Sequence, residues 1–312
     1  MAQEDPPGSA ALARGASRGR LAVVGAAGAA VLLALAPRPA GAGEVVVLRS
    51  GDLAQHRAVE EAFVRGMKHP VRSVVVAPGD PRHNPRGLAS AELVFAIGPE
   101  AASAAAALKG PRVLYALVPD PQRHGLDYRS PGIPSWPHPS TALSALHDLV
   151  PTARRVGILT DPSQSGEYVA RCRLAARGSD LIFRVREVRT HAEVAGALRA
   201  LLPQVDAIWL VPDDTVVSKE TIGAIIETAL ETGVPAVGCG EAQVQAGLPL
   251  GVEPDWSDVG RQAAEAAGQI LASAEPQLAP PAAALFVNAR SAARLHLTLT
   301  PALRARAQKV YE

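Results

Sequence analysis

Short apolar runs and stretches of helical periodicity alternate along the chain after residue 43. The clearest case is residues 206–218, in which the apolar run 207–211 is followed by the polar turn Pro212-Asp213-Asp214-Thr215. Apolar residues then recur at helical spacing up to residue 230. A strand, a polar turn and an amphipathic helix in this order are half of a βαβ unit. The turn is therefore expected at the carboxyl edge of a parallel sheet, where ligands of open α/β sheets bind.

The same alternation continues on both sides of this stretch. The expected strands are 45–48, 71–77, 93–97, 113–118, 156–160, 182–188, 207–211, 235–239, 250–252 and 285–287. The expected helices are 54–67, 101–108, 141–149, 167–177, 192–202, 219–232 and 256–273, with two shorter pieces around 291–297 and 301–310. Strands that alternate with helices pair in parallel through right-handed crossovers. The pattern therefore predicts an α/β fold with two doubly wound parallel-sheet lobes.

The alternation stops in two places. Residues 78–87 are rich in turn residues, with three prolines and no helical period, so the connection to the next strand is expected to be short. Residues 122–139 hold several prolines and glycines, which favours a crossing between domains over another element. Trp136 in this tract is expected to pack under the loop rather than line a cleft.

The first 42 residues have the composition of an export signal. Arg14, Arg18 and Arg20 precede an uncharged run over residues 21–36, and Ala40-Gly41-Ala42 has the small residues of a cleavage site. This order predicts a secretory signal peptide over residues 1–42, with cleavage after Ala42. The uncharged run is shorter than the ~20 residues needed to span a bilayer, although an uncleaved anchor remains an alternative.

Charge and composition argue against several classes of protein. The 31 basic and 30 acidic residues nearly balance, whereas a nucleic-acid-binding protein would need a basic patch or stripe. The chain has no nucleophile elbow and no phosphate-binding loop, and its eight histidines lack metal-ligand spacing. We therefore expect no enzymatic activity, no cofactor and no metal. Cys172 and Cys239 are expected to be buried thiols, with His83 and His124 as the histidines nearest the predicted cleft.

Two facing α/β blocks would place their carboxyl-edge turns on opposite walls of one cleft. Helix amino termini suit a carboxylate there, and Asp213 or Asp214 suits an ammonium group, so the combination suits a zwitterion. One of residues 213–215 also has the position of a helix cap. Asp213→Ala is expected to weaken binding without unfolding the protein. The candidate ligand-binding residues are Ser50, Gly98, Pro99, Glu100 and Asp120 on the first wall and Asp161, Asp213, Asp214, Thr215 and Glu241 on the second.

Five segments carry a family resemblance. They are LVFAIGPEAASAA (93–105), YALVPDPQRHGL (115–126), LVPTARRVGILTDP (149–162), VDAIWLVPDDTVVS (205–218) and VNARSAARLHLTLTPAL (287–303). In order and spacing they resemble the bacterial ABC-transporter substrate-binding proteins related to tryptophan and tyrosine binders. The resemblance implies a type I periplasmic-binding-protein fold, with two α/β lobes, three hinge crossings and a ligand closed between the lobes.

The resemblance also implies a domain organisation and a set of contacts. The helix from Trp256 would return to the first lobe and the tail from Leu285 would rejoin the second. The implied parts are a signal peptide (1–42), a first lobe (43–130 plus about 254–282) and a second lobe (131–253 plus about 283–312). The family's ligand contacts would fall near Ser50 and at Gly98, Asp213 and Thr215.

Three features of this chain differ from the family pattern. Pro99 stands where the family usually has a threonine, and the proline-rich tract 131–139 replaces an asparagine-threonine-glycine hinge. The helix usually found between the second and third strands is largely missing around residues 81–89.

The export signal, the twin blocks and the ordered segments predict a periplasmic solute-binding protein. It would capture a small polar organic solute, such as an amino acid or a derivative, as a monomer, and deliver it to an ABC permease in the inner membrane. The departures at the pocket and hinge favour an alternative, a periplasmic sensor or docking module that feeds a signalling partner. A two-lobe enzyme such as a glycosyl transferase is a more distant alternative, against which the export signal argues.

Overall fold

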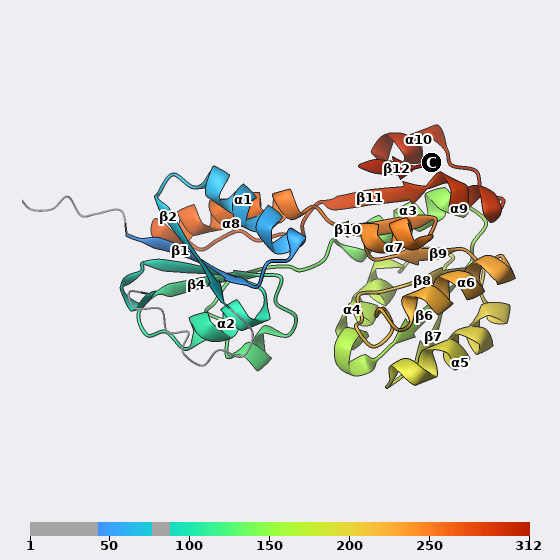
Figure 1. Cartoon of the computed structure of the whole chain (residues 1–312), viewed down its shortest axis with the longest axis horizontal. Helices are drawn as coiled ribbons and strands as arrows, with labels where there is room; N and C mark the ends of the chain where they lie inside the picture. The colour runs from blue at the N-terminus through green and yellow to red at the C-terminus, as the bar shows by residue number, and fades with distance from the viewer. Residues whose placement is uncertain (1–42, 77–87) are drawn as a thin grey trace, which may run out of the picture. The chain divides into compact units, whose positions relative to one another are not determined.

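The computed structural model describes residues 43–76 and 88–312. The expected signal peptide over 1–42 and the turn-rich stretch 78–87 with His83 lie outside the described residues, as does most of the segment 81–89. Two sheets with helices on their faces make up the described part (Figure 1). The prediction of an α/β fold with two lobes is confirmed.

The first lobe is built on a five-stranded, wholly parallel sheet in the order β2-β1-β3-β4-β5. Its central strand β3 is buried along its whole length, because helices cover both faces. The strands are β1 (Val45–Ser50), β2 (Val71–Val76), β3 (Leu93–Ile97), β4 (Arg112–Ala116) and β5 (Gly132–Ile133), and the helices are α1 (Ala54–Gly66), α2 (Pro99–Ala106) and α8 (Trp256–Leu271).

The second lobe is built on a seven-stranded sheet in the order β12-β11-β10-β9-β8-β6-β7. Its strands are β6 (Arg155–Thr160), β7 (Ile182–Glu187), β8 (Ala207–Trp209), β9 (Ala236–Gly238), β10 (Leu250–Pro254), β11 (Ala283–Asn288) and β12 (Lys309–Tyr311). Its helices are α3 (Pro139–Leu149), α4 (Pro162–Ala175), α5 (His191–Leu201), α6 (Ile222–Thr232), α7 (Glu241–Ala246), α9 (Ala289–Arg294) and α10 (Pro301–Arg306). Single 3₁₀ turns cover Leu88–Ser90, Pro121–His124 and Leu202–Gln204.

Several elements differ from the sequence-based expectation. β11 runs antiparallel to β10, so the second sheet is mixed rather than purely parallel. The short strand β5 lies in the proline-rich tract, where no element was expected. Its Gly132 pairs with Tyr115 of β4, and a Cβ at position 132 would lie 2.1 Å from the ring of Tyr115. The helix expected over 301–310 ends at Arg306, because the last residues form β12 on the free edge of β11. α7 was not expected at all.

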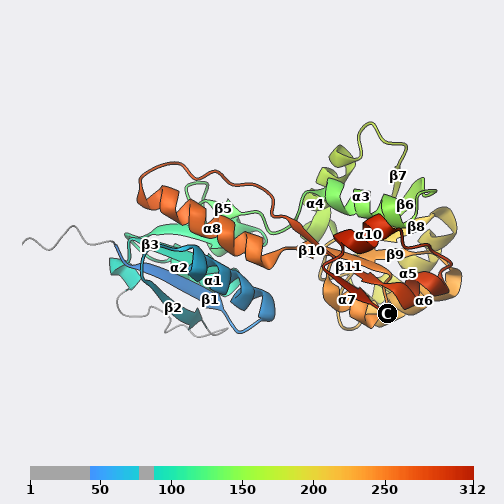
Figure 2. The same ribbon diagram turned by 90° about the horizontal axis from the view of Figure 1, so that it is seen from above.

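Helix α8 follows a strand of the second lobe but packs on the first. Figures 1 and 2 show it side by side with α1, and it joins the buried cluster that contains the Phe63 and Phe95 rings, whose centroids are 4.5 Å apart. A Cβ at Gly260 would lie 2.3 Å from the carbonyl oxygen of Val59 and 2.6 Å from Cβ of Ala62. The close approach of α1 and α8 therefore requires glycine at position 260.

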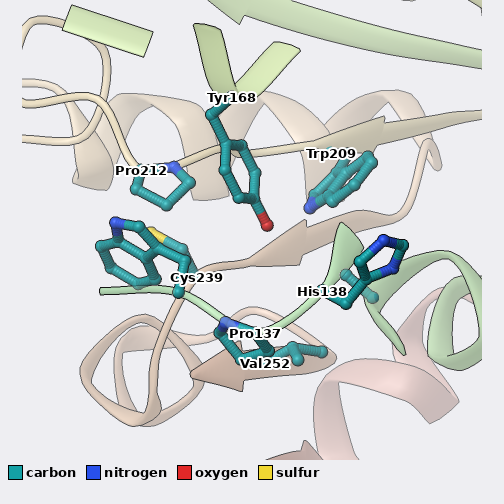
Figure 3. Close-up of a pocket in the computed structure, with 9 residues that line it drawn as sticks. Pro137, His138, Tyr168, Trp209, Pro212, Cys239 and Val252 are labelled. Carbon is teal, nitrogen blue, oxygen red and sulfur yellow. The ribbon is translucent and has the colours of Figure 1, made fainter. Parts of the chain in front are cut away.

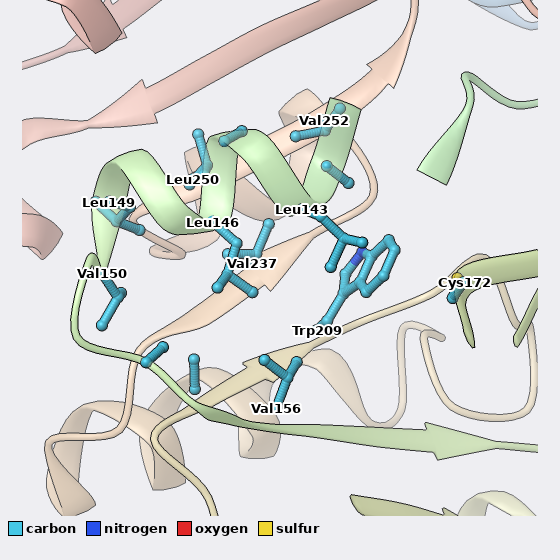
Figure 4. Packing of buried hydrophobic residues seen from close by; sticks show 14 of the residues in the cluster. Leu143, Leu146, Leu149, Val150, Val156, Cys172, Trp209, Val237, Leu250 and Val252 are labelled. Atoms are coloured by element: carbon cyan, nitrogen blue, oxygen red, sulfur yellow. The ribbon is translucent and has the colours of Figure 1, made fainter. Parts of the chain in front are cut away.

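The core of the second lobe lies on both faces of its sheet. On one face, α3 inserts Leu143, Leu146 and Leu149 against Trp209, Val237 and Leu250 of the sheet (Figure 4). On the other face, α5 and α6 pack on Ile208 and Leu210. In the part of the chain that the structure describes, no helix is long and apolar enough to cross a membrane.

Asp206 joins two strands at the amino edge of the second sheet. Its Oδ2 accepts hydrogen bonds from the backbone N–H groups of Arg154 at 2.9 Å and Arg155 at 2.7 Å. Its Oδ1 accepts from the Arg155 guanidinium at 2.5 Å. The Arg155 side chain is the main cause that holds the pKa of Asp206 well below its usual range. These bonds tie the start of β8 to the start of β6.

Asp206→Asn is expected to lower the free energy of unfolding at neutral pH by about 1–3 kcal/mol, because charge-assisted hydrogen bonds are lost. The folded-state pKa of Asp206 lies below its unfolded value of about 3.9. Its contribution is therefore present above that value and is lost as the pH falls toward the folded-state pKa. Urea unfolding at neutral and acidic pH should show the difference between wild type and variant shrinking below about pH 4.

The exposed Asp180 supplies a matched control. Asp180→Asn is expected to change the free energy of unfolding by less than about 0.5 kcal/mol. Equal losses in the two variants would contradict the role assigned to Asp206.

Candidate functional site

The carboxyl ends of β1 and β3 hold a buried hydrogen-bonded cluster. Ser50 ends β1, and its Oγ accepts a bond from the backbone N–H of Ala101 in α2 at 2.8 Å. His56 of α1 donates from Nδ1 to the carbonyl oxygen of Ser50 at 2.6 Å. Both side chains are 5% exposed, and burial is the main cause that lowers the pKa of His56. Because Ser50 Oγ is the acceptor in its bond to Ala101, its hydroxyl proton can serve a second partner as donor.

Gly98 connects β3 to α2 directly beside this cluster. Its φ of +89° lies in the left-handed region, and a Cβ there would lie 2.8 Å from Ser50 Oγ and 2.9 Å from His56 Cε1. Pro99 occupies the first turn of α2, where its missing N–H costs nothing. Glu100 follows in the same turn and is partly exposed. Ser50, Gly98, Pro99 and Glu100 are thus brought together as expected from their places after β1 and β3.

Asp120 and His124 follow β4 and each has a partner nearby. Asp120 is exposed and pairs with Arg123, with 2.6 Å between Oδ2 and Nε. His124 bonds to the hydroxyl of Ser103 at 3.0 Å. His56 was not among the candidates from the sequence, although it precedes Val59 and Phe63 by three and seven residues. All three therefore lie on the buried stripe of α1.

Asp213, just beyond β8, is the hub of the corresponding edge in the second lobe. Its Oδ2 accepts bonds from the backbone N–H of Asp161 at 2.6 Å and from the hydroxyl of Ser165 at 2.5 Å. Its Oδ1 accepts from the backbone N–H groups of Thr215 at 3.0 Å and Val216 at 3.1 Å. The side chain is 5% exposed. These four bonds commit the Asp213 carboxylate to joining the ends of β6 and β8.

Asp161 extends this network at the end of β6. Its Oδ1 accepts from the N–H of Ser163 at 3.0 Å and from the Ser163 hydroxyl at 2.8 Å, which caps α4. Its Oδ2 accepts from the hydroxyl of Thr215 at 3.0 Å, and the guanidinium of Arg189 lies 3.5 Å from Oδ1. The bond from Ser163 is the main cause that lowers the pKa of Asp161. Asp161, Asp213 and Thr215 therefore form one connected unit.

Asp214 and Glu241 differ in whether their carboxylates are free. Asp214 is exposed, and in residues 43–76 and 88–312 no hydrogen bond or ion pair joins its side chain to another group. Glu241 accepts a bond from the hydroxyl of Tyr311 and another from Lys309 Nζ at 3.2 Å, so it holds β12 to α7. The Tyr311 bond is the main cause that lowers the pKa of Glu241. None of residues 213–215 caps α6, which begins at Ile222.

An aromatic pocket lies next to this edge in the second lobe (Figure 3). The rings of Tyr168 and Trp209 meet edge to face, with centroids 6.3 Å apart and an interplanar angle of 73°. The hydroxyl of Tyr168 points into the pocket. Trp136 lines the pocket, contrary to the expectation that it packs under its loop. The lining residues are Trp136, Pro137, His138, Ala142, Tyr168, Trp209, Pro212, Cys239 and Val252.

The described residues show little support for metal chemistry or thiol reactivity. Among them, no group of three histidine, cysteine or carboxylate side chains could hold a metal ion. Cys172 and Cys239 are free thiols. Burial raises the pKa of each thiol to about 12, so both are protonated at neutral pH.

Three solved structures of known proteins are similar to this chain. The ligand-free, open structure of a substrate-binding protein with adhesive properties from Clostridium difficile matches with a TM-score of 0.69 and 18% identity, covering 86% of this chain and 99% of that chain. The ABC domain in complex with L-Trp from Streptococcus pneumonia matches with a TM-score of 0.63 and 20% identity, over 86% and 99% of the two chains. A periplasmic ribose ABC transporter from Conexibacter woesei matches with a TM-score of 0.56 and 13% identity, over 86% and 100%. A comparison with curated proteins found no match.

At these identities the solved structures show the fold alone, which is the two-lobe, type I periplasmic-binding-protein fold. The model of the family described as ABC transporter substrate binding protein matches residues 140–311. This match spans more than half of the chain. The protein belongs to the ABC transporter substrate-binding protein family, a family of solute-binding proteins.

Gly98→Ala is expected to lower the free energy of unfolding by about 2–4 kcal/mol, because left-handed strain and overpacking add. Gly51→Ala is the matched control, since Gly51 has a φ of +64° but no atom within 4 Å of a built Cβ. It should cost only the strain, about 1–2 kcal/mol. Urea unfolding measures both, and equal losses would contradict the close contact of Gly98 with Ser50 and His56.

Asp213→Ala is expected to lower the free energy of unfolding by about 2–4 kcal/mol, because it leaves buried donors of β6 and of the following turn without an acceptor. Asp214→Ala should change it by less than about 0.5 kcal/mol. This result would differ from the sequence-based expectation that Asp213→Ala acts on binding alone. Urea unfolding of the two variants in parallel checks the contrast, and a stable Asp213→Ala variant would contradict the structural role.

Proposed function

We propose that the protein is exported, captures a small polar organic solute between its lobes, and delivers it to an ABC permease in the inner membrane. Residues 1–42 act as a cleaved signal peptide and the mature chain works as a periplasmic monomer. The first lobe comprises residues 43–133 plus about 254–282, because β5 pairs with β4. The second lobe comprises residues 134–253 plus about 283–312. We therefore propose a boundary three residues later than the one expected from the sequence.

The observation that carries this proposal is the free carboxylate of Asp214 beside a fully bonded network. Asp161, Asp213 and Thr215 satisfy one another and hold the turn in place, while Asp214 stays exposed with no internal partner among the described residues. A carboxylate held on a rigid turn suits an ammonium group, because little side-chain and backbone freedom is lost on binding. We therefore assign recognition of the ammonium group to Asp214 and the positioning of this turn to Asp213.

The first lobe supplies the complementary chemistry. The hydroxyl of Ser50 keeps a proton to donate, and the amino terminus of α2 carries partial positive charge, so both suit a ligand carboxylate. Gly98 lets the start of α2 approach Ser50 and His56 closely, and Glu100 and Asp120 are kept as candidate contacts on the same wall. An amino acid or a derivative carries both an ammonium and a carboxylate group. A structure of similar fold holds L-Trp, which supports this solute class.

Transport would depend on closure of the lobes. A ligand that contacts Ser50 on one lobe and Asp214 on the other binds the closed state more tightly than the open state. Ligand therefore shifts the population toward the closed state, which a permease can distinguish from the open one.

The test is a thermal-shift screen of purified protein, freed of carried-over ligand, against amino acids, short peptides, sugars and nucleosides. A native-state ligand at a hundredfold excess over its dissociation constant stabilises by about 2.7 kcal/mol, which raises the melting temperature. Asp214→Asn should weaken binding of the identified zwitterion by roughly tenfold to a hundredfold, because a charge-assisted bond is lost. The same variant should leave binding of the N-acetylated solute unchanged.

Asp180→Asn is the control for charge alone and should bind as the wild type does. Equal affinity of Asp214→Asn and wild type for the free solute would exclude Asp214 from the site. A flat screen on folded protein would contradict the solute-binding proposal and favour a sensor or docking module of the same fold.

A further inference from the structure

The aromatic pocket has two sides of different origin. One side comes from the second lobe itself, where Tyr168 of α4, Trp209 of β8, Pro212 and Cys239 form a corner. The other side comes from the tract that links the lobes, through Trp136, Pro137 and His138. Trp209 belongs to the buried cluster of the second lobe and Tyr168 packs against that cluster, so their side of the pocket is rigid.

The pocket is nearly filled in this state. The volume open to the centre of a water-sized sphere is about 10 Å³, which is room for one water molecule. An aromatic ring needs several times that space. Trp136 is the largest side chain on the linker side, and it is only half-buried. Moving this one side chain outward would open the corner without disturbing the core.

The lining residues of the pocket include no carboxylate, lysine or arginine. Burial raises the pKa of both the Tyr168 phenol and the Cys239 thiol, so both are neutral at physiological pH. The Tyr168 hydroxyl points into the space as a polar group (Figure 3). Pro212, which lines the pocket, is two residues from Asp214 on the same turn. A flat, uncharged ring in the pocket would therefore lie close to the carboxylate that we assign to the ammonium group.

We propose that Trp136 is an intramolecular lid on a ring-binding subsite formed by Tyr168, Trp209, Pro212 and Cys239, and that the apolar part of the solute enters by displacing Trp136. This inference rests on the proposed function, because the subsite holds the side chain of the same solute. Trp136 thereby lowers the affinity for the solute, because its indole side chain competes with the ligand for the subsite. A smaller residue at position 136 therefore tightens binding of the ligand. The linker carries Trp136, so entry of the ligand also frees one crossing between the lobes.

Indole, which has no charged group, is the probe for the subsite alone. Trp136→Ala is expected to bind indole at least about tenfold more tightly than the wild type by titration calorimetry, because the truncated side chain leaves an apolar cavity that a ring can fill. Trp136→Leu keeps apolar packing for the linker and should show an intermediate gain. Trp136→Phe, which retains a ring, should bind indole as weakly as the wild type.

Trp256→Phe is the matched control for loss of a tryptophan, since Trp256 lies at the start of α8 and not in the pocket. It should bind indole as the wild type does. If wild type, Trp136→Ala and Trp136→Leu bind indole with equal affinity, the proposal that Trp136 is a lid is wrong. If Trp136→Ala does not fold, the comparison of Trp136→Leu with the wild type tests the proposal. Tighter indole binding by the variants, together with no hit in the solute screen, would support the ring-binding subsite and contradict the proposed function. A hit in the solute screen without tighter indole binding would support the proposed function and contradict the subsite.

Discussion

The buried carboxylate of Asp213 is the interaction on which the carboxyl edge of the second sheet depends. Four donors from the end of β6, from α4 and from its own turn converge on two oxygens. A buried carboxylate is stable only when such donors compensate for its lost hydration. The network therefore fixes the turn after β8 and leaves Asp214 and the neighbouring pocket as the parts that remain free to meet a ligand.

Two of the three crossings between the lobes are bonded to each other. The N–H of Asp255 donates to the carbonyl of Ala282 at 2.8 Å, and the N–H of Ala282 donates to Asp258 at 2.8 Å. Glu253 adds a bond from the backbone of Glu241 and another from the side chain of Trp256. The third crossing instead places Trp136 in the aromatic pocket. The two crossings that bond to each other suit a hinge. The third crossing carries Trp136, whose contact with the pocket a ligand can replace.

The places of the candidate residues at the strand ends could be predicted from the sequence, but the hydrogen bonds that each one makes could not. Ser50, Gly98, Asp161 and Asp213 all follow or end apolar runs, and the parallel strands of each sheet bring such positions to the carboxyl edge of that sheet. Whether a carboxylate is free depends on partners far along the chain: Asp213 bonds to Asp161, 52 residues away, and Glu241 bonds to Tyr311, 70 residues away. No local pattern distinguishes Asp213 from Asp214, although one is the hub of a network and the other is exposed.

The sequence by itself determined the α/β class and nearly all of the longer helices and strands, because burial repeats with the local periods of strand and helix. The five ordered segments indicated the family through their resemblance to known proteins. Tertiary structure alone decided the antiparallel entry of β11 and the strand β12 where helical spacing continues. Each depends on a strand edge built by distant residues, such as the open edge of β11. The same holds for Trp136, whose neighbours in the pocket come from α3, α4, β8 and β10 and from the turns after β8 and β9. Local composition sets what each segment can form, and nonlocal packing selects which partner it meets.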